Sequence, residues 1–413
     1  MLSVAEALEL IRANVPSLAP RRVALADAFG SRLAETVTSD VDSPPYDKSV
    51  VDGYAIRFDD LRGGRAELRF LEEVTAGALP TCEVRPGTAT RIMTGAPLPI
   101  GADTVVMVER SAQPSADIVQ LDDPRAKLGQ NIVRRGTVMR KEDVVLAAGA
   151  QIMPAAVGLL AEAGRGSIFA LPRPRVAVLA TGNELVPCGE VPQPGQIRNS
   201  NGPLLVASLR QAGAEAVDLG IARDERTALR NKIVQGLEAD LLILSGGVSA
   251  GVLDLVPGLL AELGVREVFH KVSLKPGKPL WFGVWTSPAG IMKPVFGLPG
   301  NPVSTLVCFE LFVYPSTVRL SGAAWPGESE FLARLAEPFH HRGDRPTYWP
   351  ARLNYRATDD CMIVSPLPWQ GSGDLRSLAG ADTLIGFPAG ERRFESGDQV
   401  MVRALRHAPL YML

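Results

Sequence analysis

Two patterns of hydrophobic positions alternate in the second half of the chain. Between residues 174 and 325, short apolar runs such as RVAVLATG and DLLILSGG alternate with segments such as GPLLVASLRQAG, whose apolar residues recur every three or four positions. Short apolar runs are typical of buried strands, and the longer spacing is typical of helices. Their alternation predicts a doubly wound α/β domain built around a parallel sheet.

The remaining segments show shorter patterns. Apolar residues spaced three or four apart after Ser3 predict a helix over 3–14, with Ser3 as its N-cap. Short apolar runs between glycine and proline turns predict a β-rich module from about 55 to 145. A further helix is expected over 153–164, and the pattern from 326 to 413 predicts a small barrel or sandwich.

Two helices of the α/β region carry more specific expectations. The segment LDLVPGLLAELG predicts a helix that Pro257 breaks, because proline lacks the N–H that an inner helical position donates. The segment that begins at Asn301 and ends near Gly322 predicts one long helix. The sequence also indicates where this helix begins, since Asn301 is a favourable N-cap and Pro302 suits the first helical position.

Composition narrows the class of protein. The 413 residues carry a formal net charge of -2, so no basic field indicates nucleic acid or an anionic membrane. We expect no signal peptide and no membrane span, and therefore a cytoplasmic protein. No two of the cysteines have the C-x-x-C spacing of a metal or redox site, and we interpret all four as packing residues: Cys82, Cys188, Cys308 and Cys361.

Three loops at the predicted strand ends carry polar or glycine-rich sequences. In an open α/β sheet, ligands bind at the carboxyl ends of the strands, so these loops are expected to share one site. The candidate residues lie in ATGNELVP, LSGGVSAG and GLPGNPVS: Thr181, Gly182, Glu184, Ser245, Gly246, Gly247, Ser249, Pro299, Gly300, Asn301 and Pro302.

The chemistry of these loops predicts a site for an oxyanion. Gly246 and Gly247 would let backbone amides approach an anion, and a helix that begins at Pro302 directs its partial positive charge to the same edge. Lys275 and Lys278 in SLKPGKPL add two full charges on a loop stiffened by proline. The sequence contains neither a P-loop nor a strand–G-x-G-x-x-G–helix unit.

The first half of the chain supplies acidic and hydroxyl candidates. Asp52 precedes Gly53 in VVDGYAIR, a pair that is typical of a tight turn. Thr94 follows a predicted strand in RIMTGAPLP. Taken alone, each fits a turn or a backbone cap as well as a catalytic site.

Seven segments in order resemble one family. They are YDKSVVDGYAIR, RIMTGAPLPIGADTVVMVE, ATGNELV, GQIRNSNGPLL, ILSGGVSAG, KPGKPL and GLPGNPVSTLVCFELFV. The chain resembles the molybdopterin molybdenumtransferases, which include the E domain of gephyrin, over about residues 3–400. The resemblance implies four domains: a discontinuous helical region (1–42 and 145–173), a β-rich lobe (43–144), an α/β molybdopterin-binding domain (174–325) and a C-terminal β-barrel-like domain (326–413).

The resemblance also implies an activity. Members insert molybdate into the dithiolene of adenylylated molybdopterin, and the adenylyl phosphoanhydride is hydrolysed with release of AMP. Mg²⁺ assists the reaction. The family is an elongated homodimer, in which the lobe of one subunit faces the α/β domain of the other. A molybdopterin adenylyltransferase and apo-molybdoenzymes are expected as possible protein partners.

The resemblance assigns roles residue by residue. Lys275 and Lys278 correspond to the lysines near molybdate and phosphate, and Ser372 to a serine of the C-terminal domain near the oxyanion. The strand-end loops correspond to the substrate cradle. The acidic and hydroxyl positions of the family's site are matched by Asp52, Thr94, Glu184, Asp224 and Asp254. Of these, Asp52, Glu184 and Asp254 are expected to bind Mg²⁺, because hard oxygen ligands suit this ion. A helix cap is an equally good interpretation of Asp224.

Three positions depart from the family pattern. Val138 lies where an acidic residue is usual, and Val252 lies where a polar residue is common. Pro350 lies near the place of an expected arginine, for which Arg345 or Arg352 could substitute. These departures favour a non-catalytic pterin-binding scaffold of the same fold, which is kept as an alternative function. An adenylyltransferase is a second alternative, because the α/β domain alone would suit that step. Tungstate is an alternative oxyanion, because it is nearly the same size and charge as molybdate.

Overall fold

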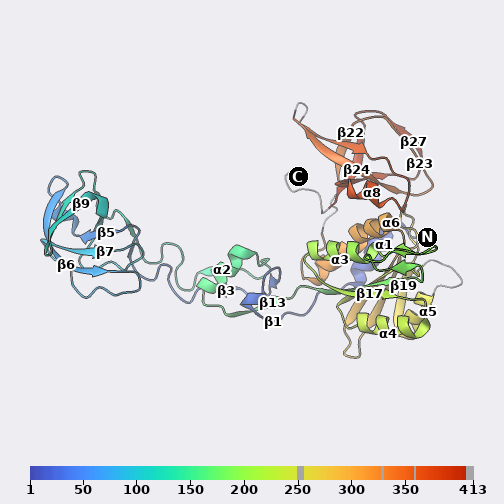
Figure 1. The fold of residues 1–413 in the computed structure, drawn as a ribbon, viewed down its shortest axis with the longest axis horizontal. Coiled ribbons are helices and arrows are strands. Elements are labelled where there is room, and N and C mark those ends of the chain that lie inside the picture. The colour runs from blue at the N-terminus through green and yellow to red at the C-terminus, as the bar shows by residue number, and fades with distance from the viewer. Residues whose placement is uncertain (249–254, 327–329, 358–359, 406–413) are drawn as a thin grey trace. The chain divides into compact units, whose positions relative to one another are not determined.

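The computed structural model describes residues 1–248, 255–326, 330–357 and 360–405, which form two compact units (Figure 1). One unit contains Val23–Phe29 and Leu33–Ile168. The other contains Met1–Arg22, Gly30–Arg32 and the described residues from Phe169 onward. The candidate residues are therefore divided between the units, and each unit is described separately.

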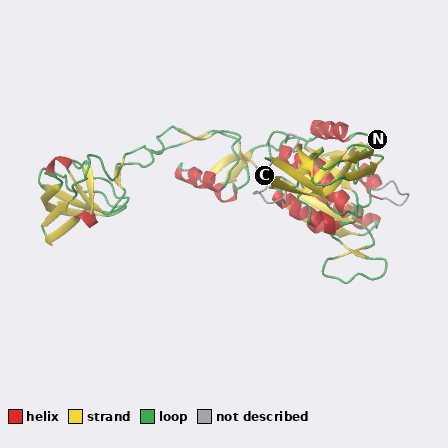
Figure 2. Ribbon diagram, turned by 90° about the horizontal axis from the view of Figure 1, so that it is seen from above, coloured by secondary structure: helices red, strands yellow, loops and turns green. Residues whose placement is uncertain are grey.

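The first unit consists mainly of strands, with short helical turns (Figure 2). Its largest sheet has six strands in the order β8-β5-β7-β6-β10-β9. Along β5, Tyr54 and Ile56 pack into one apolar cluster and Ala55 packs into another, as the two-residue period of a strand requires. The strands are β5 (Gly53–Ile56), β6 (Arg65–Val74), β7 (Thr88–Ile92), β8 (Thr104–Met107), β9 (Ser111–Ser115) and β10 (Ile118–Asp122).

Shorter elements make up the rest of this unit and the segments where the chain passes from one unit to the other. The helix predicted over 153–164 is observed as α2 (Pro154–Glu162), and Gly164 follows its C-cap with a φ of +74°. The other elements are β1 (Arg21–Ala24), η1 (Leu25–Asp27), β2 (Arg32–Leu33), β3 (Val37–Thr38), β4 (Lys48–Ser49), η2 (Phe58–Asp60), η3 (Val108–Arg110), β11 (Ile132–Val133), β12 (Val144–Leu146) and β13 (Ser167–Leu171).

The second unit contains the α/β sheet, in the order β17-β14-β18-β21-β20-β19. β17, β14, β18 and β21 are parallel, as predicted, whereas β20 pairs antiparallel with both β21 and β19. The connections on either side of β20 contain no helix, and without a crossover neighbouring strands pair antiparallel. The strands are β14 (Arg175–Thr181), β17 (Glu215–Ala222), β18 (Leu241–Ser245), β19 (Val265–His270), β20 (Trp281–Thr286) and β21 (Met292–Leu298), with a small outlying pair, β15 (Leu185–Val186) and β16 (Ile197–Arg198).

Helices cover both faces of this sheet, with α1, α3 and α6 on one side and α4 and α5 on the other (Figure 1). Val176 and Val178 of β14 pack with α1 and α3, whereas Ala177 and Leu179 pack with α4 and α5. Ser3 caps α1 through a capping box with Glu6, as predicted for its N-terminus. The helices are α1 (Val4–Asn14), α3 (Asn201–Gln211), α4 (Arg226–Gly236) and α5 (Leu255–Glu262).

Of the two helix predictions for the α/β region, one is wrong and one is confirmed. Pro257 does not break its helix: α5 runs through it without interruption, and Pro257 lies in the first turn of the described helix, where no N–H needs an internal partner. The long helix from Pro302 to Leu320 is confirmed as α6 (Pro302–Cys308), a π-helical turn (Phe309–Val313) and α7 (Tyr314–Leu320). By length and composition it could cross a membrane, but 83% of its most apolar window is buried, as in the core helix of a folded domain.

The same unit ends in a closed five-stranded barrel, which confirms the β-rich C-terminal domain. Its interior is filled by aliphatic side chains such as Leu353, Val364, Ile385 and Val402. The barrel strands are β22 (Glu330–Leu335), β25 (Cys361–Pro366), β24 (Thr347–Arg356), β26 (Thr383–Phe387) and β28 (Gln399–Ala404), accompanied by the pair β23 (Phe339–Gly343) and β27 (Gly390–Phe394) and by α8 (Leu375–Ala379).

Candidate functional site

A pocket of about 620 Å³ lies between the α/β sheet and the barrel of the second unit. Three cations line it, namely Lys275, Lys278 and Arg345, and its lining among the described residues contains no carboxylate. We call it the cation pocket. Its other lining residues are Leu274, Pro276, Gly277, Pro279, Pro299, Asn301, Ser304, Trp349, Trp369, Gln370, Gly371 and Ser372.

The barrel holds the lysine loop by its backbone. The N–H of Lys275 donates to the carbonyl of Pro346 at 2.9 Å, and the carbonyl of Lys275 accepts from the N–H of Tyr348 at 2.8 Å. The Arg345 guanidinium donates to the carbonyl of Leu274 at 3.3 Å. Lys275 thus forms a β-bridge with Thr347. Because its backbone is held in place, its ammonium group extends from a fixed position.

Gly277 allows the loop to turn tightly between the two lysines. Its φ is +128°, and an added Cβ would lie 2.7 Å from a Leu274 methyl and 2.8 Å from the Cys308 sulfur. Only glycine tolerates both constraints. Burial raises the pKa of the Cys308 thiol, so beneath this turn Cys308 is a neutral packing residue, as its scattered position in the sequence suggested.

Asn301 joins the α/β domain to the barrel loop. Its Nδ2 donates to the Ser372 hydroxyl at 2.9 Å, and the N–H of Val303 donates to the Ser372 carbonyl at 3.0 Å. Asn301 occupies the N-cap position as predicted, but its side chain makes no capping hydrogen bond. The predicted N-cap position is therefore confirmed, but the side chain is directed to the barrel loop instead of to the first-turn amides. One of the first-turn amides of α6 is likewise used by the protein.

The three strand-end loops meet at one edge of the sheet, as the sequence predicted. β14, β18 and β21 are neighbours, so Thr181, Ser245 and Pro299 leave the sheet side by side. Gly246 has a φ of +92°, and a Cβ there would lie 2.5 Å from the Thr181 carbonyl. Gly300 approaches Gly246, since a Cβ on Gly300 would lie 3.9 Å from the Gly246 Cα.

Glu184 and Asp224 lie at the end of the loop after β14. The Glu184 carboxylate folds over Gly182, where an added Cβ would lie 2.4 Å from one of its oxygens. Asp224 accepts from the Asn183 N–H at 3.2 Å, and its own N–H donates to the Asn183 side chain at 3.0 Å. Asp224 does not cap α4, whose N-cap residue is Glu225. The structure therefore favours a role for Asp224 in holding this loop.

Asp52 and Thr94 form a separate site in the strand-rich unit. The N–H and the hydroxyl of Thr94 both donate to Asp52 Oδ1 at 2.7 Å. These two bonds lower the pKa of the Asp52 carboxyl, the backbone bond having the larger effect, and the charge of Arg91 adds to them. Asp52 and Thr94, which the sequence proposed separately, therefore act together: Thr94 fixes the exposed carboxylate of Asp52.

Three family models match consecutive parts of the chain. They are described as the MoeA N-terminal region (domains I and II) over residues 2–164, a probable molybdopterin binding domain over 177–318, and the MoeA C-terminal region (domain IV) over 332–405. A molybdopterin molybdenumtransferase from Nostoc sp. is 36% identical, and the match covers 98% of this chain and 94% of that protein. The chain belongs to the molybdopterin molybdenumtransferase family.

Other relatives and solved structures agree. A molybdopterin molybdenumtransferase from Staphylococcus aureus is 33% identical, with coverage of 97% of this chain and 94% of that protein. The molybdopterin biosynthesis MoeA protein of Pyrococcus horikoshii has a similar crystal structure, with a TM-score of 0.75 and 30% identity over 98% of this chain and 99% of that one. The resemblance inferred from the sequence is thereby confirmed over nearly the full length.

The structure locates two of the three positions that depart from the molybdenumtransferase pattern. Of the two arginines considered as substitutes, Arg345 lines the cation pocket, whereas Arg352 lines a different pocket and donates to the Gly380 carbonyl at 3.2 Å. Val138 is 72% exposed, and the nearby Asp143 carboxylate accepts from the Arg140 N–H within its own turn. Val252 lies outside the described residues.

The predicted metal ligands are not gathered by the described part of the chain. No group of three His, Cys, Asp or Glu side chains there could hold a metal ion. Asp52 belongs to the strand-rich unit and Glu184 to the other, while Asp254, like the substrate-loop residue Ser249, lies outside the described residues. Glu184 is exposed and its carboxylate lies against Gly182, so it fits one oxygen ligand of Mg²⁺ rather than a complete site.

Sequence reasoning missed part of the pocket. Ser304 is 4% exposed and lies three residues after Asn301, so the helical period could have placed both on one side of the helix. Trp349 and Trp369 pack edge to face with ring centroids 4.8 Å apart. No local pattern identifies these tryptophans, because they reach the pocket only when the barrel packs against the α/β domain.

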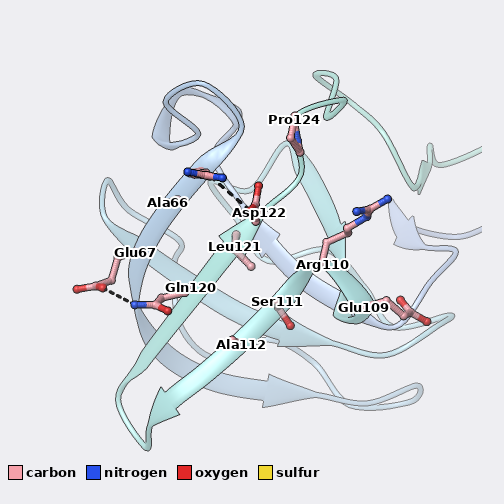
Figure 3. A pocket seen from close by; sticks show the side chains of 11 residues that line it. Ala66, Glu67, Glu109, Arg110, Ser111, Ala112, Gln120, Leu121, Asp122 and Pro124 are labelled. Atoms are coloured by element: carbon pink, nitrogen blue, oxygen red, sulfur yellow. Dashed lines mark hydrogen bonds and ion pairs between the residues drawn. The ribbon is translucent and has the colours of Figure 1, made fainter.

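The strand-rich unit has a larger and shallower hollow of about 850 Å³ that contains none of the predicted site residues (Figure 3). Its charges are mixed: Arg65 pairs with Asp122 at 3.4 Å, and Gln120 donates to Glu67 at 2.9 Å (Figure 3). The lining has two arginines, Arg65 and Arg110, and three carboxylates, Glu67, Glu109 and Asp122, so it does not favour a small anion. The cation pocket is therefore the better candidate for an anionic substrate.

Proposed function

We propose that this protein inserts molybdate into adenylylated molybdopterin and releases AMP, giving molybdenum cofactor. The observation that carries the proposal is the cation pocket: three cations and two serine hydroxyls surround a space that no described carboxylate enters. A dianion such as molybdate meets an opposite charge there. Family membership supplies the identity of the substrate.

Each part of the site takes a role in this proposal. Lys275 and Lys278 hold molybdate and offset the charge that develops on the departing phosphate, and Arg345 adds a third positive charge. The Gly246–Gly247 and Pro299–Pro302 loops cradle the pterin and its phosphates with backbone amides other than those of Gly246 and Val303, which donate to the Leu298 and Ser372 carbonyls. The repulsion between the two anionic reactants is thus offset before they meet.

Mg²⁺ is part of the proposal. The chemistry that it would supply is neutralisation of the phosphoanhydride oxygens. Glu184 would contribute a carboxylate oxygen, and the substrate phosphates would contribute others, which suits an ion that rarely binds in an all-protein cage. Asp52, held by Thr94, is proposed as a further ligand or as the residue that orients a water.

A homodimer and a cytoplasmic location are also proposed, on the basis of family membership. In the dimer, the lobe of one subunit would bring Asp52 and Thr94 to the α/β domain of its partner. A molybdopterin adenylyltransferase and apo-molybdoenzymes are proposed as partners that supply the substrate and accept the product. Light scattering coupled to gel filtration would test the dimer, and a monomer mass at assay concentrations would contradict it.

The assay that tests the function follows AMP release. Purified protein is incubated with adenylylated molybdopterin and Mg²⁺, with and without molybdate, and the product is used to reconstitute an apo-molybdoenzyme. We expect AMP release that depends on molybdate and a product that restores activity. A parallel reaction with tungstate measures oxyanion preference. Binding without any AMP release would contradict the proposal and support a non-catalytic scaffold.

A further inference from the structure

Asn201 connects two of the strand-end loops through its side-chain amide. It begins α3 and is 8% exposed. Its Nδ2 donates to the Ser245 hydroxyl at 2.8 Å and to the Gly300 carbonyl at 2.7 Å. One buried amide thus contacts the end of β18 and the loop after β21.

The chemistry of these partners fixes the orientation of the amide. The Gly300 carbonyl can only accept, so it requires the Nδ2 donor; a flipped amide would place Oδ1 against it and two acceptors would repel. Both hydrogens of Nδ2 are used in the observed orientation. The Oδ1 atom is buried and has no hydrogen-bond partner among the described residues. Asn201 therefore acts as a double donor.

Asn201 connects the two loops just beyond the last backbone pairing between β18 and β21. Ser245 and Leu298 are the last paired residues of β18 and β21, and the Gly246 N–H donates to the Leu298 carbonyl at 3.1 Å. Beyond that point the chains separate into two loops, and Gly300 is exposed. Asn201 fixes the Gly300 carbonyl relative to Ser245 across this gap.

The consequence reaches the cation pocket. Gly300 is followed by Asn301, whose amide donates to Ser372 on the pocket wall. A series of contacts therefore runs from the end of β18 through Asn201 and Gly300 to Asn301 and the barrel loop. Displacement of Gly300 would therefore also displace Asn301, and with it the contact between the α/β domain and the barrel loop.

We propose that Asn201 is a positioning residue that aligns the Gly-Gly loop with the Pro-Gly-Asn-Pro loop for the anionic part of the substrate. The inference rests on the proposed function and adds a residue to it. Asn201 acts through Ser245 and Gly300. Loss of contacts that hold the ground state and the transition state equally raises KM and leaves kcat nearly unchanged, so the effect of displacing this substrate cradle is expected mainly in KM.

Asn201→Ala tests the proposal, with Asn199→Ala as the matched control. Asn199 lies on the same segment and accepts from the Gly202 N–H at 3.0 Å, so its loss also weakens the start of α3 but leaves both loops in place. We expect Asn201→Ala to raise the KM for adenylylated molybdopterin about tenfold or more, with a smaller change in kcat. Asn199→Ala should lower Tm similarly and change KM less than about twofold.

A second variant and a binding measurement complete the test. Asn201→Asp preserves the size of the side chain but turns an acceptor toward the Gly300 carbonyl, so it should raise KM at least as much even if Asn201→Ala folds poorly. Equilibrium binding of adenylylated molybdopterin without molybdate should show the same loss. A KM and a Kd in both Asn201 variants no worse than in Asn199→Ala would overturn the proposal. Binding without turnover by the wild type would overturn only the proposed function, whereas no binding would overturn both.

Discussion

The cation pocket and the Asp52 turn fix their charged groups in different ways. Asp52 is held by the N–H and hydroxyl of Thr94 within one sheet of one unit. Lys275 is held by backbone bonds to Pro346 and Tyr348, which lie about 70 residues further along the chain at the start of the barrel strand β24. The first arrangement depends on two neighbouring strands of one sheet, β5 and β7. The second depends on the packing of two domains, so it should be more sensitive to distant changes.

The largest effect is expected from Lys275→Ala. The substitution removes a cation from the pocket but keeps both backbone bonds of the loop, so the fold should be retained. We expect molybdate-dependent AMP release to fall about 100-fold or more, in line with the loss of one preorganised electrostatic group. Lys271→Ala is the control, because Lys271 precedes the same loop and does not line the pocket. Wild-type activity in a folded Lys275→Ala protein would contradict the role of this lysine.

A smaller effect is expected from Asp52→Asn. The asparagine oxygen can still accept both bonds from Thr94, so the turn is kept while the negative charge is lost. We expect a loss of about 10- to 100-fold in the rate of AMP release, with little change in Tm. Thr94→Val, which keeps the backbone bond, should cost less. A rate equal to that of the wild type would show that the turn, rather than the charge, is what matters.

Ser372→Ala tests the contact between the two domains. It removes the hydroxyl that accepts from Asn301 but leaves the backbone bond from Val303. The hydroxyl also lines the cation pocket, and loss of one hydrogen bond to molybdate corresponds to roughly 1 kcal/mol, so the Kd for molybdate should rise about fivefold. Ser377→Ala, in the neighbouring helix α8, is a control outside the cation pocket. An equal rise in both variants would indicate general loosening of the barrel loop.

The smallest effect concerns pH and the barrel beneath the lysine loop. His341 is 2% exposed and stacks on Phe387. Burial lowers its pKa, and the positive charge of Lys275 lowers it further. The unfolded chain therefore binds a proton more readily, and stability is lost as the pH falls below the unfolded pKa of about 6.5.

The measurement for this prediction compares Tm at pH 7.5 and pH 5.5. His341→Gln should be less stable than the wild type at pH 7.5, since a buried stacked ring is lost, but it should lose less Tm on acidification. If both proteins lose the same amount, other groups cause the acid sensitivity.

Much of the α/β half of the site could be predicted from the sequence because its geometry follows from strand order. The loops at Thr181, Ser245 and Pro299 follow neighbouring strands and therefore meet, whatever the details of packing. Of the three loops, the one that follows Leu298 lines the same pocket as the lysine loop. These features follow from hydrophobic periodicity and turn residues, both of which can be identified in short stretches of sequence.

Contacts that depend on the packing of domains or on individual side chains could not be predicted. Asn301 occupies its predicted N-cap position, but its side chain donates to Ser372, a contact that forms only when the barrel packs against the α/β domain. Arg345 was only one of two candidates until the barrel placed it in the pocket. Asn201 lies in a recognised motif, but nothing local indicates that its amide bridges two loops. The roles assigned to Asp52, Glu184 and Asp254 in metal binding stay predictions.

The central claim is that the cation pocket binds an oxyanion. Anomalous diffraction at the molybdenum edge, from crystals soaked in molybdate, tests it most directly. The account predicts a peak within hydrogen-bonding distance of Lys275 or Lys278 and close to Ser372, and the loss of that peak in Lys275→Ala crystals. Saturating molybdate that gave no peak there, or a peak only elsewhere on the protein, would contradict it.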